Sequence, residues 1–242
     1  MEATLVADLR STWALVPLRG LEDAKTRLGG ELDPEERLEL VVAMARRTLL
    51  AARDTSGIVG TVLVTADPAA ADMAAELGAR TIVQRLPGLN AALREARVGA
   101  VELGATAVLI LPIDLPAVSP ARLEEVLADA ARAMVGPPAA RSLVLAVPDR
   151  RGEGTNVLLV TPPASIEPAF GEGSLQAHAE AAAAAGATFR LHGGPLTLDV
   201  DTGADLLAVE AAGGHPAGGH PAGGHAAGGR PVSSMAPERH GP

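Results

Sequence analysis

The chain has 242 residues and a formal net charge of −9, and 48% of its residues are hydrophobic although only Trp13, Phe170 and Phe189 are aromatic. This length fits one sizeable α/β domain, and the acidic balance with so few aromatic rings excludes binding to long nucleic acid. The absence of cysteine excludes disulfides and thiolate chemistry, and no apolar run reaches the ~20 residues that span a bilayer, so we expect a cytoplasmic protein.

Residues 1 to about 210 alternate short apolar runs with amphipathic stretches. This pattern predicts one α/β domain, 1–210, in which a mostly parallel central sheet carries helices on both faces. The remaining residues, 211–242, repeat the motif GGHPA and contain almost no large apolar side chain to bury. We therefore expect them to form a disordered tail.

The first strand is predicted at residues 13–17, and the loop after it carries three cations, Arg19, Lys25 and Arg27. Asp33 is the expected N-cap of a long amphipathic helix. The later elements are expected, in chain order, at 58–65 (strand), 68–77 (helix), 81–83 (strand), about 88 onward (helix), 107–111 (strand), 120–134 (helix), 143–147 and 155–160 (strands), about 174 onward (helix), 189–192 and 196–200 (strands), and a final helix opened by Thr202.

Residues 107–111, AVLIL, form the most uniformly apolar of these strands, and we expect them at the centre of the sheet. Asp114 follows this strand within the segment PIDLP, whose two prolines stiffen the backbone. Open α/β sheets bind ligands beyond the carboxyl ends of their strands. Asp114 is therefore a candidate functional carboxylate, although it could also simply begin a turn or cap a helix.

A second acidic pair, Asp199 and Asp201, follows the last predicted strand. Alternation along an extended segment places both carboxylates on one face. Together with Asp114 they could hold Mg²⁺, which prefers oxygen ligands and often shares them with substrate phosphates. The alternative is that Asp201 or Thr202 only caps the following helix, which makes Asp199 the better ligand candidate.

Three glycine-containing segments, 88–90, 152–156 and 170–174, combine small residues with free backbone amides and could bind anions. Each is also what an ordinary loop or helix start looks like. Two histidines outside the tail, His178 and His192, could be core or surface residues.

Taken in order, six segments resemble those of the phosphoenolpyruvate and 2-phospho-L-lactate guanylyltransferases, enzymes of coenzyme F-420 biosynthesis: PLRGLEDAKTRL, GLNAAL, LPIDLP, GTNVLL, FGEGSLQAH and LDVDTGADL. The similarity covers about residues 11–210. It implies a single-domain, Rossmann-like nucleotidyltransferase fold of the glycosyltransferase-A type. Two departures are Arg19, where relatives commonly have lysine, and Leu175, where they frequently have phenylalanine.

The resemblance also implies roles for individual residues. By this resemblance, Asp114 and Asp199 would be magnesium ligands, and Asp201 could share or replace the role of Asp199. The pocket for the phosphate of the acid would be formed by Thr155, Gly171 and Ser174. The phosphates of GTP would be faced by Lys25 with Arg19 and Arg27, and Asn90 would lie near the nucleoside.

The implied reaction transfers GMP from GTP to a phosphorylated three-carbon acid and releases pyrophosphate. Phosphoenolpyruvate is the favoured acid because the Ala-, Gly- and Arg-rich composition resembles that of actinobacterial chains, and 2-phospho-L-lactate and 3-phospho-D-glycerate stay open as acceptors. Two competing hypotheses are a nucleotidyltransferase for a molybdopterin or sugar phosphate, whose glycine-rich first loop this chain lacks, and a noncatalytic nucleotide-binding module. The oligomeric state does not follow from the sequence.

Overall fold

The computed structural model of this chain describes residues 8–21, 24, 30, 32–135, 142–200 and 205. Its strands are β1 (Thr12–Pro17), β2 (Ile58–Thr65), β3 (Arg80–Val83), β4 (Ala107–Ile110), β5 (Leu143–Pro148), β6 (Thr155–Thr161) and β7 (Thr188–Leu191). Its helices are α1 (Pro34–Asp54), α2 (Pro68–Glu76), α3 (Leu89–Glu102), α4 (Pro120–Met134), α5 (Ser174–Ala184) and the 3-10 turn η2 (Pro195–Thr197).

The strands form one sheet in the order β3-β2-β1-β4-β6-β5-β7. All neighbouring pairs run parallel except the two that involve β6, which is antiparallel to both β4 and β5. The predicted mostly parallel sheet is therefore confirmed. So is the central position of β4, whose four residues are all buried.

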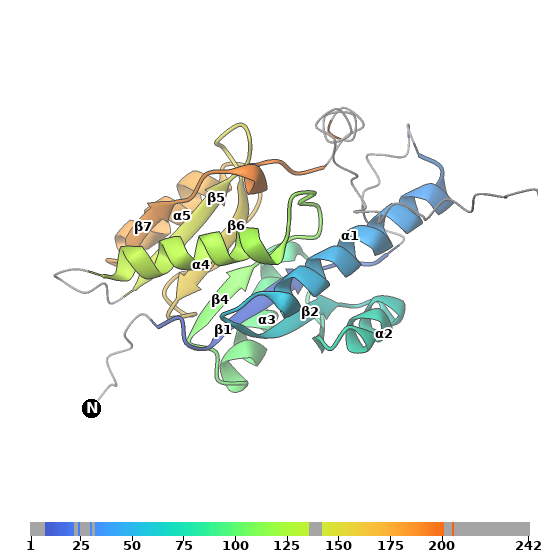
Figure 1. The fold of residues 1–242 in the computed structure, drawn as a ribbon, viewed down its shortest axis with the longest axis horizontal. Helices are drawn as coiled ribbons and strands as arrows, with labels where there is room; N and C mark the ends of the chain where they lie inside the picture. The colour runs from blue at the N-terminus through green and yellow to red at the C-terminus, as the bar shows by residue number, and fades with distance from the viewer. Residues whose placement is uncertain are drawn as a thin grey trace, which may run out of the picture.

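Helices cover both faces of the sheet, as predicted. Helices α1 and α4 lie across the front in Figure 1, and α3 and α5 lie behind. Alternate residues of each strand face the two layers, as the pleat of a β-strand requires. In β1, Ala14 and Val16 pack under α1, whereas Trp13 and Leu15 pack toward α3. Aliphatic side chains thus fill both core layers.

Local sequence signals explain most helix starts. Asp33 caps α1 by accepting hydrogen bonds from the backbone of Glu35 and Glu36, and the Glu36 carboxylate accepts from the Asp33 N–H, which completes a capping box. The N-caps of α2 and α4 are Asp67 and Ser119, each followed by proline. Helix α5 instead begins after Gly173, which adopts φ 67°, a left-handed conformation that favours glycine.

The predicted strand at 196–200 is wrong. Residues 195–197 form the turn η2, and the chain after it pairs with no strand among the described residues. Pro195 has no N–H to donate to a neighbouring strand, and the Val200 N–H donates to the carbonyl oxygen of Asp114 instead. The predicted final helix and the tail lie outside the described residues, so the domain boundary near residue 210 stays a prediction.

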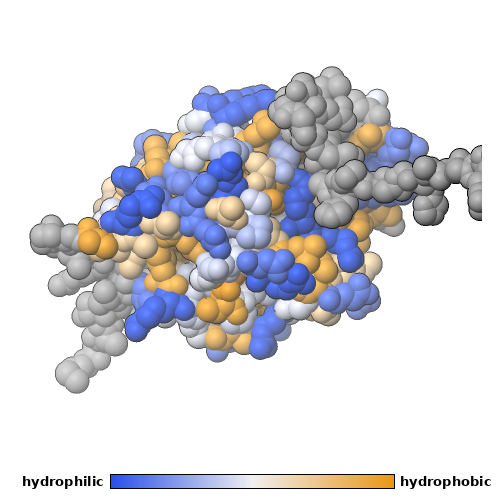
Figure 2. All heavy atoms as spheres, viewed as in Figure 1, coloured by the Kyte–Doolittle hydropathy of each residue, from blue (hydrophilic) through white to orange (hydrophobic). Residues whose placement is uncertain are grey.

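On the face viewed in Figure 2, hydrophobic side chains are interspersed with hydrophilic ones. Among the described residues, no helix is both long enough and apolar enough to cross a bilayer.

Candidate active site

The candidate residues gather at the edge of the sheet where the parallel strands end. Strand β6 runs in the opposite direction, so its first residue, Thr155, lies at the same edge as the end of β4. The β4–β6 register pairs Ile110 with Leu158. Asp114 follows the last residue of β4 by four positions, at the edge of the sheet where β6 begins. The single reversed strand thus places two predicted groups, the metal ligands and the acid pocket, at the same edge of the sheet.

The two acidic segments also meet at this edge. The Val200 N–H donates a 3.0 Å hydrogen bond to the carbonyl oxygen of Asp114, so the backbones of the two segments lie side by side. Asp114 and Asp199 are both half-buried. Asp201 lies outside the described residues, and within them no group of three acidic or histidine side chains is close enough to hold a metal ion. The described pair provides hard carboxylate oxygens, the ligand type that Mg²⁺ prefers.

Two further contacts fix the segment that carries Asp199. The buried Asn156 side chain of β6 donates to the carbonyl oxygen of Leu196, at 3.0 Å, and so holds η2 against the sheet. Beyond Asp199, Asp205 forms an ion pair with Arg150 at 2.6 Å, and its side chain is only 4% exposed. The loop after β5 and the start of β6 therefore position the second acidic segment.

The three residues predicted to bind the acid's phosphate lie together. The Thr155 N–H donates to Ser174 Oγ at 2.9 Å, and the Ser174 N–H donates to the carbonyl oxygen of Gly171 at 3.1 Å. Gly171 has φ 135°, a conformation that L side chains rarely adopt, and it is exposed. Ser174 is the first residue of α5, so these three residues lie at the amino end of that helix, where the helix dipole favours an anion.

His178 lies one helical turn after Ser174 and contacts both Thr155 and the backbone of Ala169. It has no exposed surface. Its Nε2 accepts a hydrogen bond from the Ala169 N–H at 3.0 Å, its Nδ1 lies 3.0 Å from Thr155 Oγ1, and the Phe170 ring packs edge-on against it at 5.0 Å between centroids. Burial lowers the pKa of the His178 imidazole to about 4, so the ring is neutral near pH 7.

Asn90, at the start of α3, is hydrogen-bonded to the segment that carries Gly171. Its Oδ1 accepts from the Phe170 N–H at 2.8 Å, and its Nδ2 donates to the Phe170 carbonyl oxygen at 2.9 Å. Two turns later on the same helix, Arg97 donates to the carbonyl oxygen of Ile166 at 2.9 Å and pairs with Glu167 at 2.6 Å. Helix α3 is thus fastened at two points to the segment that leads into Gly171.

On the other side of α3, two adjoining pockets open around Arg19. One, of about 340 Å³, is lined by β1, β2 and the start of α3, with Gln84, Gly88 and Leu89 among its residues. The other, of about 540 Å³, lies between the loop after β1 and the start of α2. Both volumes are in the range of small-ligand sites.

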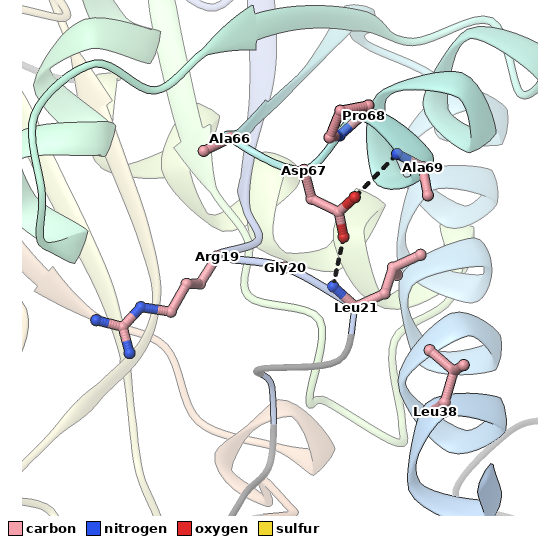
Figure 3. A pocket seen from close by; sticks show the side chains of 8 residues that line it. All are labelled: Arg19, Gly20, Leu21, Leu38, Ala66, Asp67, Pro68 and Ala69. Carbon is pink, nitrogen blue, oxygen red and sulfur yellow. Dashed lines mark hydrogen bonds between the residues drawn. The ribbon is translucent and has the colours of Figure 1, made fainter. Parts of the chain in front are cut away.

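Asp67 fixes the loop between these pockets. Its carboxylate accepts from the Leu21 N–H at 2.8 Å and from the Ala69 N–H at 2.9 Å (Figure 3). The bond from Leu21, with the other backbone bonds, lowers the pKa of the Asp67 carboxyl below its usual value. The Arg19 side chain points away from this carboxylate in Figure 3 and is exposed. Arg19 therefore keeps its charge available beside both pockets.

The outcome for the predicted site residues is mixed. The structure brings the segments of Asp114 and Asp199 together and joins Thr155, Gly171 and Ser174 in another place. It places Asn90 against Phe170 and Arg19 beside two pockets, and the predicted roles of all these residues stay predictions. Lys25, Arg27 and Asp201 lie outside the described residues.

Sequence reasoning missed the supporting roles of three residues, Asp67, Asn156 and His178. His178 had a usable signal, because residues four apart share one face of a helix and Ser174 was already a candidate.

A sequence model of one protein family, described as guanylyl transferase CofC like, matches residues 12–216. The chain belongs to this family. It is 40% identical over 208 residues to a phosphoenolpyruvate guanylyltransferase of Rubrobacter xylanophilus, covering 84% of this chain and 96% of that one. It is 38% identical over 206 residues to the protein of the same name from Sphaerobacter thermophilus, covering 85% and 94%.

Among solved structures, the fold is similar to that of 4-diphosphocytidyl-2C-methyl-D-erythritol synthase from Anaerococcus prevotii, with a TM-score of 0.54 at 11% identity, covering 85% of this chain and 99% of that one. This likeness shows the nucleotidyltransferase fold, as predicted. The CofC-like chain is thus an enzyme of a nucleotidyltransferase family, whose members need a nucleoside triphosphate and a phosphorylated acceptor, and generally a divalent metal ion. The competing hypothesis of a noncatalytic nucleotide-binding module is therefore rejected.

Proposed function

We propose that this CofC-like enzyme transfers GMP from GTP to phosphoenolpyruvate, with Mg²⁺ as its metal ion, in the biosynthesis of coenzyme F-420. The observation that carries the proposal is the similarity to phosphoenolpyruvate guanylyltransferases over nearly their whole length. A cytoplasmic location remains the expectation from the sequence.

The reaction requires two anions to approach one another. A phosphate oxygen of the acid attacks the α-phosphorus of GTP, a new P–O bond forms, and the bond to the bridging oxygen breaks as pyrophosphate leaves. Such transfers depend mainly on positioning and charge neutralisation and need no covalent intermediate on the protein. The absence of cysteine from the chain is consistent with this mechanism.

Different residues along the edge of the sheet would bind the two substrates. The pocket of about 340 Å³ at the start of α3 would hold the nucleoside, and Arg19 beside it would face the phosphates together with Lys25 and Arg27. Thr155, Gly171 and Ser174 would hold the phosphate of the acid. Because β4 and β6 are neighbours, the acid's phosphate and the metal ligands would lie at the same edge of the sheet.

Asp114 and Asp199 would hold Mg²⁺ where the two substrates meet, with Asp201 able to contribute. The fit rests on the backbone contact between their segments and on the carboxylate chemistry of both side chains. When bound, the ion supplies charge neutralisation to the reacting phosphates. The hydrogen bond from Asn156 to Leu196, at the start of segment 196–200, would help to position the second carboxylate.

The test is a pyrophosphate-release assay on the purified chain with GTP, Mg²⁺ and, in separate reactions, phosphoenolpyruvate, 2-phospho-L-lactate and 3-phospho-D-glycerate, with product masses recorded. We expect release with all components present, fastest with phosphoenolpyruvate, and a product that joins GMP to the acid. CTP and ATP in place of GTP serve as controls. No release with any acid contradicts the proposed function, and faster turnover of another acid contradicts only the choice of substrate.

A further inference from the structure

Two hydroxyl groups in the acid pocket each accept a hydrogen bond from the protein. Ser174 Oγ accepts from the Thr155 N–H at 2.9 Å, and Ser174 is only 2% exposed. Thr155 Oγ1 lies 3.0 Å from His178 Nδ1. A hydroxyl can accept and donate at the same time, so the direction of the second bond decides what Thr155 can offer to a ligand.

The contact on the far side of the His178 ring decides that direction. The Ala169 N–H can only donate, and it points at Nε2 over 3.0 Å. Nε2 must therefore be the unprotonated, accepting nitrogen, and the single ring hydrogen is on Nδ1. It follows that Nδ1–H donates to Thr155 Oγ1, and that the Thr155 hydroxyl hydrogen is not used in this contact.

The burial of the ring keeps it in this state. His178 has no exposed surface and packs against Phe170 and the start of β6. Among the described residues, neither the Thr155 nor the Ser174 hydroxyl has an acceptor for its own hydrogen. Thr155 is 8% exposed and His178 has no exposed surface, so of the two only the threonine extends to the surface of the protein.

We propose that His178 is a positioning residue which, through its Nδ1–H, makes the Thr155 hydroxyl a hydrogen-bond donor toward the phosphate of the acid. The inference rests on the proposed function and adds to it a reason for selectivity. A hydroxyl that already accepts from the protein keeps its own hydrogen for donation, which suits a group that only accepts hydrogen bonds, as a phosphate dianion does.

Two substitutions at position 178 separate this role from a structural one. In H178N the side-chain amide nitrogen replaces Nδ1 and can still donate to Thr155, but nothing accepts from Ala169. In H178Q the amide oxygen replaces Nε2 and can still accept from Ala169, but the donor to Thr155 is lost. Each variant keeps one bond of the two, so each controls for the other.

The measurement is the Kd of phosphoenolpyruvate by calorimetry, together with the KM values of phosphoenolpyruvate and GTP. We expect H178Q to weaken phosphoenolpyruvate binding by about tenfold, the effect of one hydrogen bond to a charged group, with the KM of GTP unchanged. We expect H178N to stay within about threefold of the wild type, and T155V to add little in the H178Q background. Equal losses in both variants, or a change in the KM of GTP, would overturn the inference.

Binding keeps this test separate from that of the proposed function. If the wild type binds phosphoenolpyruvate without turnover, the proposed function fails while the two variants still decide the role of His178. If it neither binds nor turns over the acid, both fail. Should the variants not fold, nitrogen-15 NMR of the wild-type histidines is decisive, because a hydrogen on Nε2 of His178 contradicts the inference whatever the activity.

Discussion

The two halves of the candidate site, which we propose to bind the acid and the nucleotide, are built differently. On the acid side, Ser174 and His178 are almost fully buried and are held by hydrogen bonds to neighbouring elements. On the nucleotide side, Arg19 and the loop before α3 are exposed, and open pockets separate the elements. We therefore expect substitutions on the acid side to change both the free energy of unfolding and substrate affinity. Substitutions on the nucleotide side should change substrate affinity alone.

The largest effect is expected where the two halves meet. D114N should lower the turnover rate by about a hundredfold or more, the cost of losing one key electrostatic stabiliser. The measurement is pyrophosphate release at saturating Mg²⁺ and substrates, with D54N, a change at the exposed end of α1, as the matched control. A D114N enzyme with near-normal turnover would remove Asp114 from the site.

The acid side should also give the protein a specific pH dependence. The pKa of His178 is lowered from 6.5 to about 4 in the folded protein, so the unfolded chain binds the proton more readily. Stability is then greatest above pH 6.5 and falls as the pH drops toward 4, by about 2 kcal/mol between pH 7 and pH 5. Urea unfolding of the wild type and H178Q over this range should show a clearly flatter profile for the variant, and parallel profiles would assign the loss to other groups.

The contact between the halves can be broken by N90A, which removes both hydrogen bonds to the Phe170 backbone. We expect a loss of about 1–2 kcal/mol in the free energy of unfolding, because a half-buried N–H and carbonyl lose their partner. We also expect kcat/KM to fall about tenfold for both substrates. If only the KM of GTP rises, Asn90 acts on the nucleoside directly and does not join the two pockets.

The smallest effect is expected at Arg19. R19A should raise the KM of GTP by about three- to tenfold and should leave the free energy of unfolding within about 0.5 kcal/mol, because the side chain is exposed. R19K should recover most of the affinity at low ionic strength, since it restores the charge. A clear loss of stability in R19A would contradict the contrast between the halves.

Sequence reasoning succeeded where the signal is local. The N-cap at Asp33 and the apolar strand β4 depend on residues a few positions apart, and both were predicted correctly. The strand expected at 196–200 was wrong because apolar alternation outweighed the signals of Gly194 and Pro195, which favour the turn that the structure shows.

The supporting contacts of the site could not be predicted in the same way. Asp67 holds Leu21 and Asn156 holds Leu196, partners 46 and 40 residues away, and no local pattern encodes such pairs. The resemblance to a family predicted the residues that would touch substrate. Only the three-dimensional structure identifies those that hold them in place.

The reversed direction of β6 also bears on how acceptor preference can change. The acid side comes from one continuous stretch, residues 149–178, that runs from the loop after β5 through β6 to the first turns of α5. The nucleotide side is collected from several separate loops. A family member could therefore change its acceptor specificity through substitutions in this single stretch of about thirty residues, while its nucleotide-binding pockets stay unchanged. A chimaera in which only this stretch is exchanged is the smallest exchange expected to transfer the acceptor specificity.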